Sequence, residues 1–116
     1  MKQLAFSNVI KPTHICNLAC SYCYNDDLRD PIMREGTLLR TIEQTFTYVR
    51  SKKSLREAHF IWHGGEPMAV GLEFYQRAMA MQRELNQGVK YLNAIQTNGV
   101  LLNARWIDFF LENGAV

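Results

Sequence analysis

Three short apolar runs, each followed by polar loop residues and then by a helical pattern, constrain the fold of this chain more than any other feature. The runs lie at residues 4–10, 58–63 and 91–96. Each has the length of a strand, and turn-forming residues follow it directly. The interval between runs is long enough for a parallel crossover, and such crossovers are right-handed and place helices outside a parallel sheet. We therefore predict one α/β domain with three parallel strand–helix units.

The spacing of apolar residues predicts the three helices. The first, between residues 37 and 53, has an apolar face formed by Leu39, Ile42, Phe46 and Val49. The second keeps the same spacing at Phe74, Ala78, Met81 and Leu85, and should stop near residues 86–88. In the third, Asn103 can cap the amino terminus and Gly114 the carboxyl terminus, with Trp106, Ile107 and Phe110 buried.

All three cysteines of the chain lie between positions 16 and 23, directly after the first predicted strand. Thiolates are preferred ligands for iron–sulfur clusters and zinc, and a short loop can direct several of them at one point. A cubane cluster has four irons, so three thiolates would leave one iron open to another ligand. A zinc site formed by these thiols and His14 is the alternative. The odd count and the tight loop disfavour a disulfide framework.

Two further polar motifs follow the second and third predicted strands. They are Gly64-Gly65-Glu66-Pro67 and Gln96-Thr97-Asn98-Gly99. Functional loops of parallel β/α folds gather at the carboxyl ends of the strands, so these motifs should lie beside the cysteines. Paired glycines allow a ligand to approach the backbone, and Pro67 keeps Glu66 extended. We interpret His63, at a strand end, as a hydrogen-bonded structural residue rather than a ligand or base.

Composition argues against two classes of partner. The formal net charge of +2 is too small to indicate a nucleic-acid or membrane surface. The basic cluster Arg50, Lys52, Lys53 and Arg56 falls where a helix should end, and cations there favour the helix dipole rather than indicating a phosphate site. No apolar run reaches membrane-spanning length and no secretory signal is evident, so we expect a cytoplasmic protein with reduced thiols.

The three motifs together resemble a known family. Cys16, Cys20 and Cys23 have the spacing C-x3-C-x2-C with Tyr22 before the last cysteine, and the two later motifs follow in order. This arrangement is similar to the amino-terminal half of radical S-adenosylmethionine (SAM) enzymes. The greatest likeness is to the SPASM-type group, which includes anaerobic sulfatase-maturating enzymes and peptide maturases. The resemblance implies the amino-terminal half of a partial TIM barrel over residues 1–116, three of six strand–helix units.

The resemblance also implies roles for single residues. Cys16, Cys20 and Cys23 would ligate three irons of a [4Fe–4S] cluster, and the amino and carboxylate groups of SAM would chelate the fourth. Tyr22 would lie near the adenine. The backbone of Gly64, Gly65, Glu66 and Pro67 would receive the SAM amino group. Polar contacts to the cofactor would come from Gln96, Thr97 and Asn98, and no catalytic side chain is identified.

In that family the reduced cluster passes one electron to SAM, and the resulting 5′-deoxyadenosyl radical removes a hydrogen atom from the substrate. The resemblance therefore implies a peptide or protein substrate and an electron donor. The alternatives are a non-catalytic zinc module and an inactive truncated product. Three units alone leave an open sheet edge and an uncovered apolar interior, so we expect self-association or completion by another chain.

Overall fold

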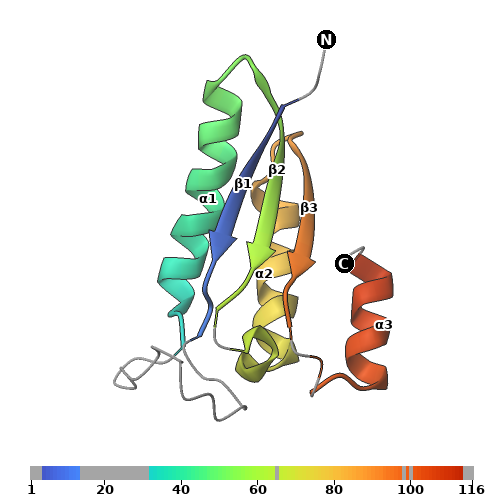
Figure 1. Ribbon diagram of the computed structural model, residues 1–116. Coiled ribbons are helices and arrows are strands. Elements are labelled where there is room, and N and C mark those ends of the chain that lie inside the picture. Colours follow the sequence, from blue (N-terminus) through green and yellow to red (C-terminus); the bar gives the residue numbers. More distant parts are fainter. Residues whose placement is uncertain (1–3, 14–31, 65, 98, 100, 114–116) are drawn as a thin grey trace.

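The computed structural model describes residues 4–13, 32–64, 66–97, 99 and 101–113. The described elements alternate strand and helix along the chain, as predicted (Figure 1). In order they are β1 (Leu4–Ile10), α1 (Glu35–Ser51), β2 (Leu55–Trp62), the 3-10 helix η1 (Pro67–Val70), α2 (Leu72–Leu85), β3 (Lys90–Ile95) and α3 (Ala104–Asn113).

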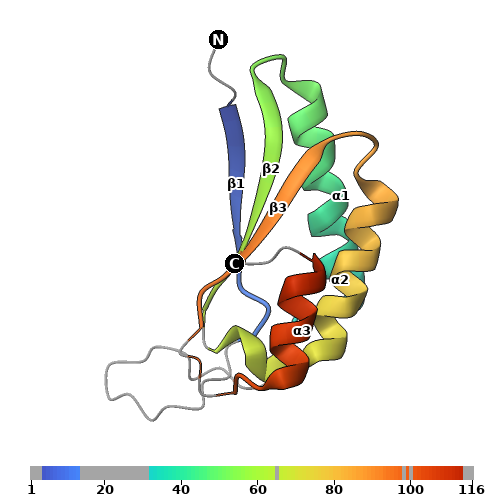
Figure 2. The ribbon, with the colours of Figure 1, turned by 90° about the vertical axis from the view of Figure 1, so that its right-hand side faces the viewer.

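The strands form one sheet in the order β1-β2-β3, and both pairs are parallel. The predicted α/β class with three parallel strand–helix units is therefore confirmed, and it fits part of a β/α barrel. Figure 2 shows α1 and α2 together on one side of the sheet. Helix α3 packs beside α2, where the rings of Tyr75 and Trp106 lie 5.7 Å apart. All three strands have their carboxyl ends at the same end of the sheet (the site edge), so the segments after them begin close together.

The core lies between the sheet and the helices. Alternate residues of β2 point into it, and Ala58, Phe60 and Trp62 are completely buried. Phe46 of α1 packs edge-on against Phe60, with ring centroids 5.4 Å apart. Such aromatic pairs add to the stabilisation from apolar burial. This packing fixes how α1 lies on β2, and it thereby fixes the position of the loop that leads into α1.

Two details of the predicted helical faces were wrong. In α1 the buried leucine is Leu38, which is 1% exposed, whereas Leu39 is 42% exposed. Leu38 lies one helical turn before Ile42, so it shares the face that meets the sheet. In α3 the buried residues are Trp106 and Phe109, and Ile107 is 46% exposed. The other residues predicted for α1, Ile42, Phe46 and Val49, are buried, as is Trp106 of α3. Only Leu39 and Ile107 were misplaced, because neighbouring apolar residues make the sequence pattern ambiguous.

A buried polar network joins β2, β3 and α2. Asn93 Oδ1 accepts hydrogen bonds from Trp62 Nε1 at 3.0 Å and from Gln82 Nε2 at 2.8 Å. Asn93 Nδ2 donates in return to Gln82 Oε1 at 2.9 Å. Buried polar groups are tolerated when they are paired in this way. The network therefore holds α2 at one position on the strands.

The face of the sheet away from the helices is not covered by the described residues (Figure 2). Val9, Ile61 and Ala94 form one row across it, and Val9 is 62% exposed. On the same face His59 Nε2 lies 3.2 Å from Glu57 Oε2. The described residues thus leave the apolar side chains of this face uncovered.

None of the helices in the described part of the chain combines the length and the apolar character needed to cross a membrane.

Candidate functional site

The candidate site begins where the three strands end. Ile10, Trp62 and Ile95 are aligned in the sheet register. The ladder continues one residue further, because His63 N donates to Ile10 O and Gln96 N donates to Trp62 O, both at 2.9 Å. The segments that carry the three predicted motifs therefore leave the sheet side by side. The segments after the three strands thus begin at one end of the sheet, as the sequence predicts, and the cysteine motif itself lies outside the described residues.

The described residues on either side of the cysteine motif pair with each other. Buried Thr13 forms an isolated antiparallel bridge with Ile32, and Met33 N donates to Pro12 O at 2.7 Å. The chain therefore leaves β1 and returns toward α1 at almost the same point. The predicted ligands and their neighbours, Cys16, Cys20, Cys23, Tyr22 and His14, lie outside the described residues. Their roles remain predictions.

Gly64 is the first described residue of the diglycine motif. Its φ is +86°, a conformation that residues with a Cβ rarely adopt. The side chain of Lys11, from the segment after β1, lies directly over it: an added Cβ would be 2.3 Å from Lys11 Cγ. The sequence indicated freedom for the backbone here but could not identify Lys11 as the neighbour. Gly65 lies outside the described residues.

Glu66 is completely buried, although its side chain is a carboxylate. Its backbone is extended, as predicted from the following proline, and its Oε2 accepts a hydrogen bond from Met68 N at 2.9 Å. This bond caps η1. The main-chain oxygen of Glu66 also accepts from Ala69 N at 2.9 Å. The carboxylate thus points into the protein, whereas the adjoining backbone forms the turn at the site edge.

Tyr75 of α2 supports the same turn from below. Its hydroxyl donates to Pro67 O at 2.6 Å, and the side chain is completely buried. Burial, together with the nearby Glu66 carboxylate, raises the pKa of Tyr75 well above its usual value. The phenol is therefore a hydrogen-bond donor at all ordinary pH values. No feature of the sequence pointed to this residue.

The third motif contacts the second. The Thr97 hydroxyl is within hydrogen-bonding distance of both Glu66 carboxylate oxygens and lies 2.8 Å from Oε2. Thr97 Oγ1 also accepts from Gly99 N at 3.1 Å. Gln96 is exposed at the end of β3, and Asn98 lies outside the described residues. The structure therefore brings the predicted residues Glu66 and Thr97 together.

His63 has an exposed side chain, and its backbone N–H continues the sheet ladder. Within the described ranges, no group of three His, Cys, Asp or Glu side chains is placed to hold a metal ion. The described part of the site offers main-chain carbonyls, one buried carboxylate and glycine backbone. The main-chain oxygens of Glu66 and Pro67 already accept from Ala69 N and from the Tyr75 hydroxyl, and a carbonyl oxygen has a second lone pair that can accept another donor.

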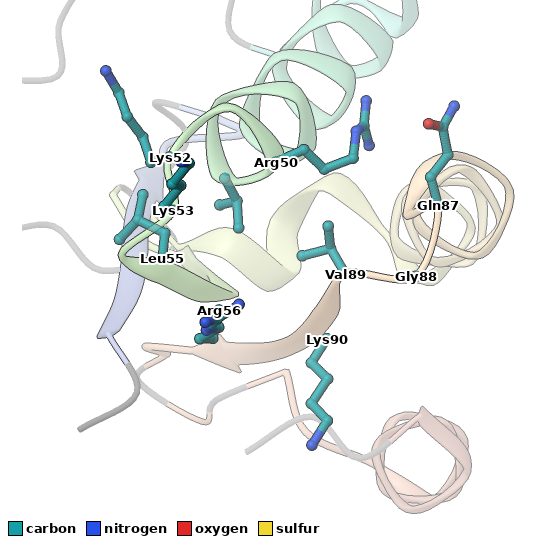
Figure 3. A pocket seen from close by; sticks show the side chains of 10 residues that line it. Arg50, Lys52, Lys53, Leu55, Arg56, Gln87, Gly88, Val89 and Lys90 are labelled. Carbon is teal, nitrogen blue, oxygen red and sulfur yellow. The ribbon is translucent and has the colours of Figure 1, made fainter. Parts of the chain in front are cut away.

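A hollow of about 520 Å³ lies at the opposite edge of the sheet (Figure 3). Its cationic lining residues are Arg50, Lys52, Lys53, Arg56 and Lys90. The side chains of Lys52 and Lys90 point in different directions rather than toward one centre, unlike the cations of a phosphate site (Figure 3). Arg50 lies in the last turn of α1 and Lys52 is its C-cap, where cations interact favourably with the helix dipole. Arg56, which the sequence grouped with them, belongs to β2. This hollow is remote from the three motifs.

Comparison with known proteins gives consistent results. Residues 10–116 match the radical SAM superfamily. The chain is 40% identical over 105 residues to the serine-type anaerobic sulfatase-maturating enzyme of Klebsiella pneumoniae, covering 87% of this chain and 26% of that protein. It is 36% identical over 116 residues to the cysteine-type enzyme of Clostridium perfringens strain 13, covering 92% of this chain and 30% of that protein.

A solved structure shares the fold. The enzyme anSMEcpe with bound AdoMet (SAM) and the Kp18Cys peptide superposes with a TM-score of 0.82 at 33% sequence identity, covering 97% of this chain and 30% of that chain. The present chain thus spans about a quarter to a third of the length of these relatives. The family match, the relatives and the fold agree: the chain belongs to the radical SAM superfamily, whose cofactors are a [4Fe–4S] cluster and SAM.

Proposed function

We propose that residues 1–116 form the amino-terminal half of the core domain of a radical SAM enzyme that modifies a peptide or protein side chain. The observation that carries this proposal is the origin of all three motif-bearing segments at one edge of the sheet, joined there by backbone hydrogen bonds. The match to the superfamily over residues 10–116 supports it. In this proposal Cys16, Cys20 and Cys23 ligate the cluster.

The SAM contacts in this proposal are those of the second and third motifs together with Tyr22. The backbone of Gly64, Gly65, Glu66 and Pro67 receives the amino group, and Gln96, Thr97 and Asn98 line the adjoining wall. The described residues fit this role chemically. Gly64 has no side chain of its own and adopts a backbone conformation that suits glycine. The main-chain carbonyl oxygens of this motif can accept a hydrogen bond from an ammonium group.

When bound, these cofactors would supply radical chemistry that begins with abstraction of a hydrogen atom from the substrate. The chain's own residues would bind and orient them. The relatives named sulfatase-maturating enzymes suggest a peptide or protein substrate, and an electron donor is then a required partner. The uncovered sheet face, with Val9, Ile61 and Ala94, would line the reaction chamber after completion by further polypeptide or a second copy. We also propose a cytoplasmic location, because the ligand thiols must stay reduced.

Anaerobic reconstitution of the chain with iron and sulfide tests the proposal. We expect a [4Fe–4S] cluster whose reduced-state EPR spectrum changes when SAM is added. Replacement of Cys16, Cys20 or Cys23 by alanine should abolish the cluster, whereas Ser21→Ala, a neutral change in the same loop, should retain it. A protein without a cluster, or with a cluster whose spectrum ignores SAM, would contradict the proposal. Zinc bound to the thiols and lost in His14→Ala would support the zinc module instead.

A further inference from the structure

The side chains of Glu66 and Thr97 connect two loops that are far apart in the sequence. Glu66 follows β2 and Thr97 follows β3, yet the Thr97 hydroxyl meets both carboxylate oxygens of Glu66. Burial of a carboxylate is costly unless the group is well hydrogen-bonded. Here the carboxylate is 0% exposed and lies between the two loops rather than at the surface of either. Its position indicates a role in holding them together.

The contact is part of a continuous chain of hydrogen bonds. Met68 N donates to Glu66 Oε2 at 2.9 Å, so the carboxylate is fixed to the start of η1. Gly99 N donates to Thr97 Oγ1 at 3.1 Å, so the hydroxyl is fixed to its own turn. Glu66 and Thr97 therefore each hold their own backbone turn, and their side chains also bind each other. A shift of either turn would break bonds in both.

We propose that Glu66 and Thr97 are a positioning pair: their side chains bind each other and set the spacing of the diglycine turn and the Gln96–Gly99 turn, while backbone groups of the two turns meet SAM. This inference rests on the proposed function and refines it. The hydroxyl of Thr97 is directed at Glu66, so Thr97 acts on SAM through the loop geometry. Glu66 likewise acts on SAM only by holding the two turns in place.

The first test measures SAM affinity of the reconstituted full chain. Thr97→Val keeps the β-branched shape and removes the hydroxyl, and we expect it to weaken SAM binding about tenfold. Thr97→Ser restores the hydroxyl and should bind within about twofold of the unaltered protein. Thr47→Val, at an exposed position on α1, is the matched control and should change nothing. A Thr97→Ser variant as weak as Thr97→Val would overturn the proposal, because the hydroxyl would not be the cause.

Glu66→Gln separates positioning from direct charge recognition. Glutamine keeps an oxygen that can accept from Met68 N and from Thr97, so we expect most of the SAM affinity to remain. If Glu66→Gln lost SAM binding while amide hydrogen exchange in the two loops stayed unchanged, the negative charge itself would meet the cofactor. That result would refute the positioning role. It would leave the proposed binding of SAM intact.

The second measurement needs no cofactor. Native-state amide hydrogen exchange of the chain reports local opening at each loop. Thr97→Val should speed exchange at Met68 and at Gly99 together, with no change at Phe60 in the middle of β2. Unchanged exchange at both amides would overturn the positioning pair even if the chain bound no SAM. Absence of SAM binding by the unaltered chain, with the exchange effect present, would instead reject the proposed function alone.

Discussion

The side chain of Lys11 crosses directly over Gly64. A Cβ on Gly64 would lie 2.3, 2.6 and 2.8 Å from Lys11 Cγ, Cδ and Cε. The two residues come from the segments after β1 and β2, which lie side by side at the site edge. A side chain at position 64 therefore requires the Lys11 stem to move.

Gly64→Ala should therefore destabilise the protein for two reasons. The backbone at φ +86° costs about 1–2 kcal/mol for a residue with a Cβ, and the new methyl group must displace the Lys11 stem. Urea unfolding measures the loss. Gly36→Ala is the matched control, because no atom lies within 4 Å of a Cβ there. It lies in the first turn of α1 and should stabilise the helix by about 0.5–1 kcal/mol.

The contact with Lys11 can be separated from the backbone strain. Lys11→Ala removes the three carbons that the methyl group would meet, so Gly64→Ala should cost less in that background. A double-mutant cycle in urea measures this coupling, which we expect to be about 0.5–1 kcal/mol. Additive effects of the two substitutions would show that the Lys11 stem moves aside freely.

Tyr75 should make stability depend on pH at the alkaline end. Its pKa is raised in the folded protein, so the folded state holds the phenolic proton more tightly than the unfolded state does. This contribution of Tyr75 to the free energy of unfolding is fully present below about pH 10, the pKa of tyrosine in the unfolded chain. It is lost as the pH rises above that value. Tyr75→Phe should cost about 0.5–1.5 kcal/mol at neutral pH, through the lost bond to Pro67 O, and flatten the decline between pH 9 and 11.

Urea unfolding across that pH range measures the effect. Tyr48→Phe is the control for a phenol on the exposed face of α1. An alkaline decline of the same steepness in Tyr75→Phe and in the unaltered protein would contradict the assignment to Tyr75.

Asn93 should be the most sensitive buried polar residue. Asn93→Leu removes the acceptor of Trp62 Nε1 and both partners of the Gln82 amide. Because unpaired buried groups cost about 1–3 kcal/mol each, we expect a loss of roughly 2–4 kcal/mol. Gln82→Leu in the same background should recover part of it by removing one unpaired amide. Gln76→Leu, at an exposed position on α2, controls for the added apolar side chain. Urea unfolding measures the free energy of unfolding of each variant. A decrease of less than ~1 kcal/mol in Asn93→Leu would show that water takes the place of the Asn93 amide.

Asn103 caps α3 as the sequence predicts, since its Oδ1 accepts from Trp106 N at 3.1 Å. Asn103→Ala should lower stability by about 1 kcal/mol, and Asn103→Asp should retain it, because aspartate caps equally well. Thermal unfolding compares the variants. Equal loss in both would indicate that the side chain acts through something other than the cap.

Local features of this protein could be predicted from the sequence. The bounds of β1 agree with the structure, and the Asn103 cap and the extended Glu66 depend on neighbours within three residues. The site edge was also predictable, because parallel strands place their carboxyl ends together whatever the side chains are. The pattern could not choose between Leu38 and Leu39, since both are apolar and only contact with the sheet distinguishes them.

Contacts between loops were decided by the tertiary structure alone. The Glu66–Thr97 bond joins residues 31 positions apart, and Tyr75 reaches Pro67 from a different element. Lys11 meets Gly64 only because β1 and β2 end in register. Such pairs depend on the spacing and register of strands in the folded sheet. The sequence alone determined at which end of the sheet the segments after the three strands begin, and packing determined which of their described side chains touch.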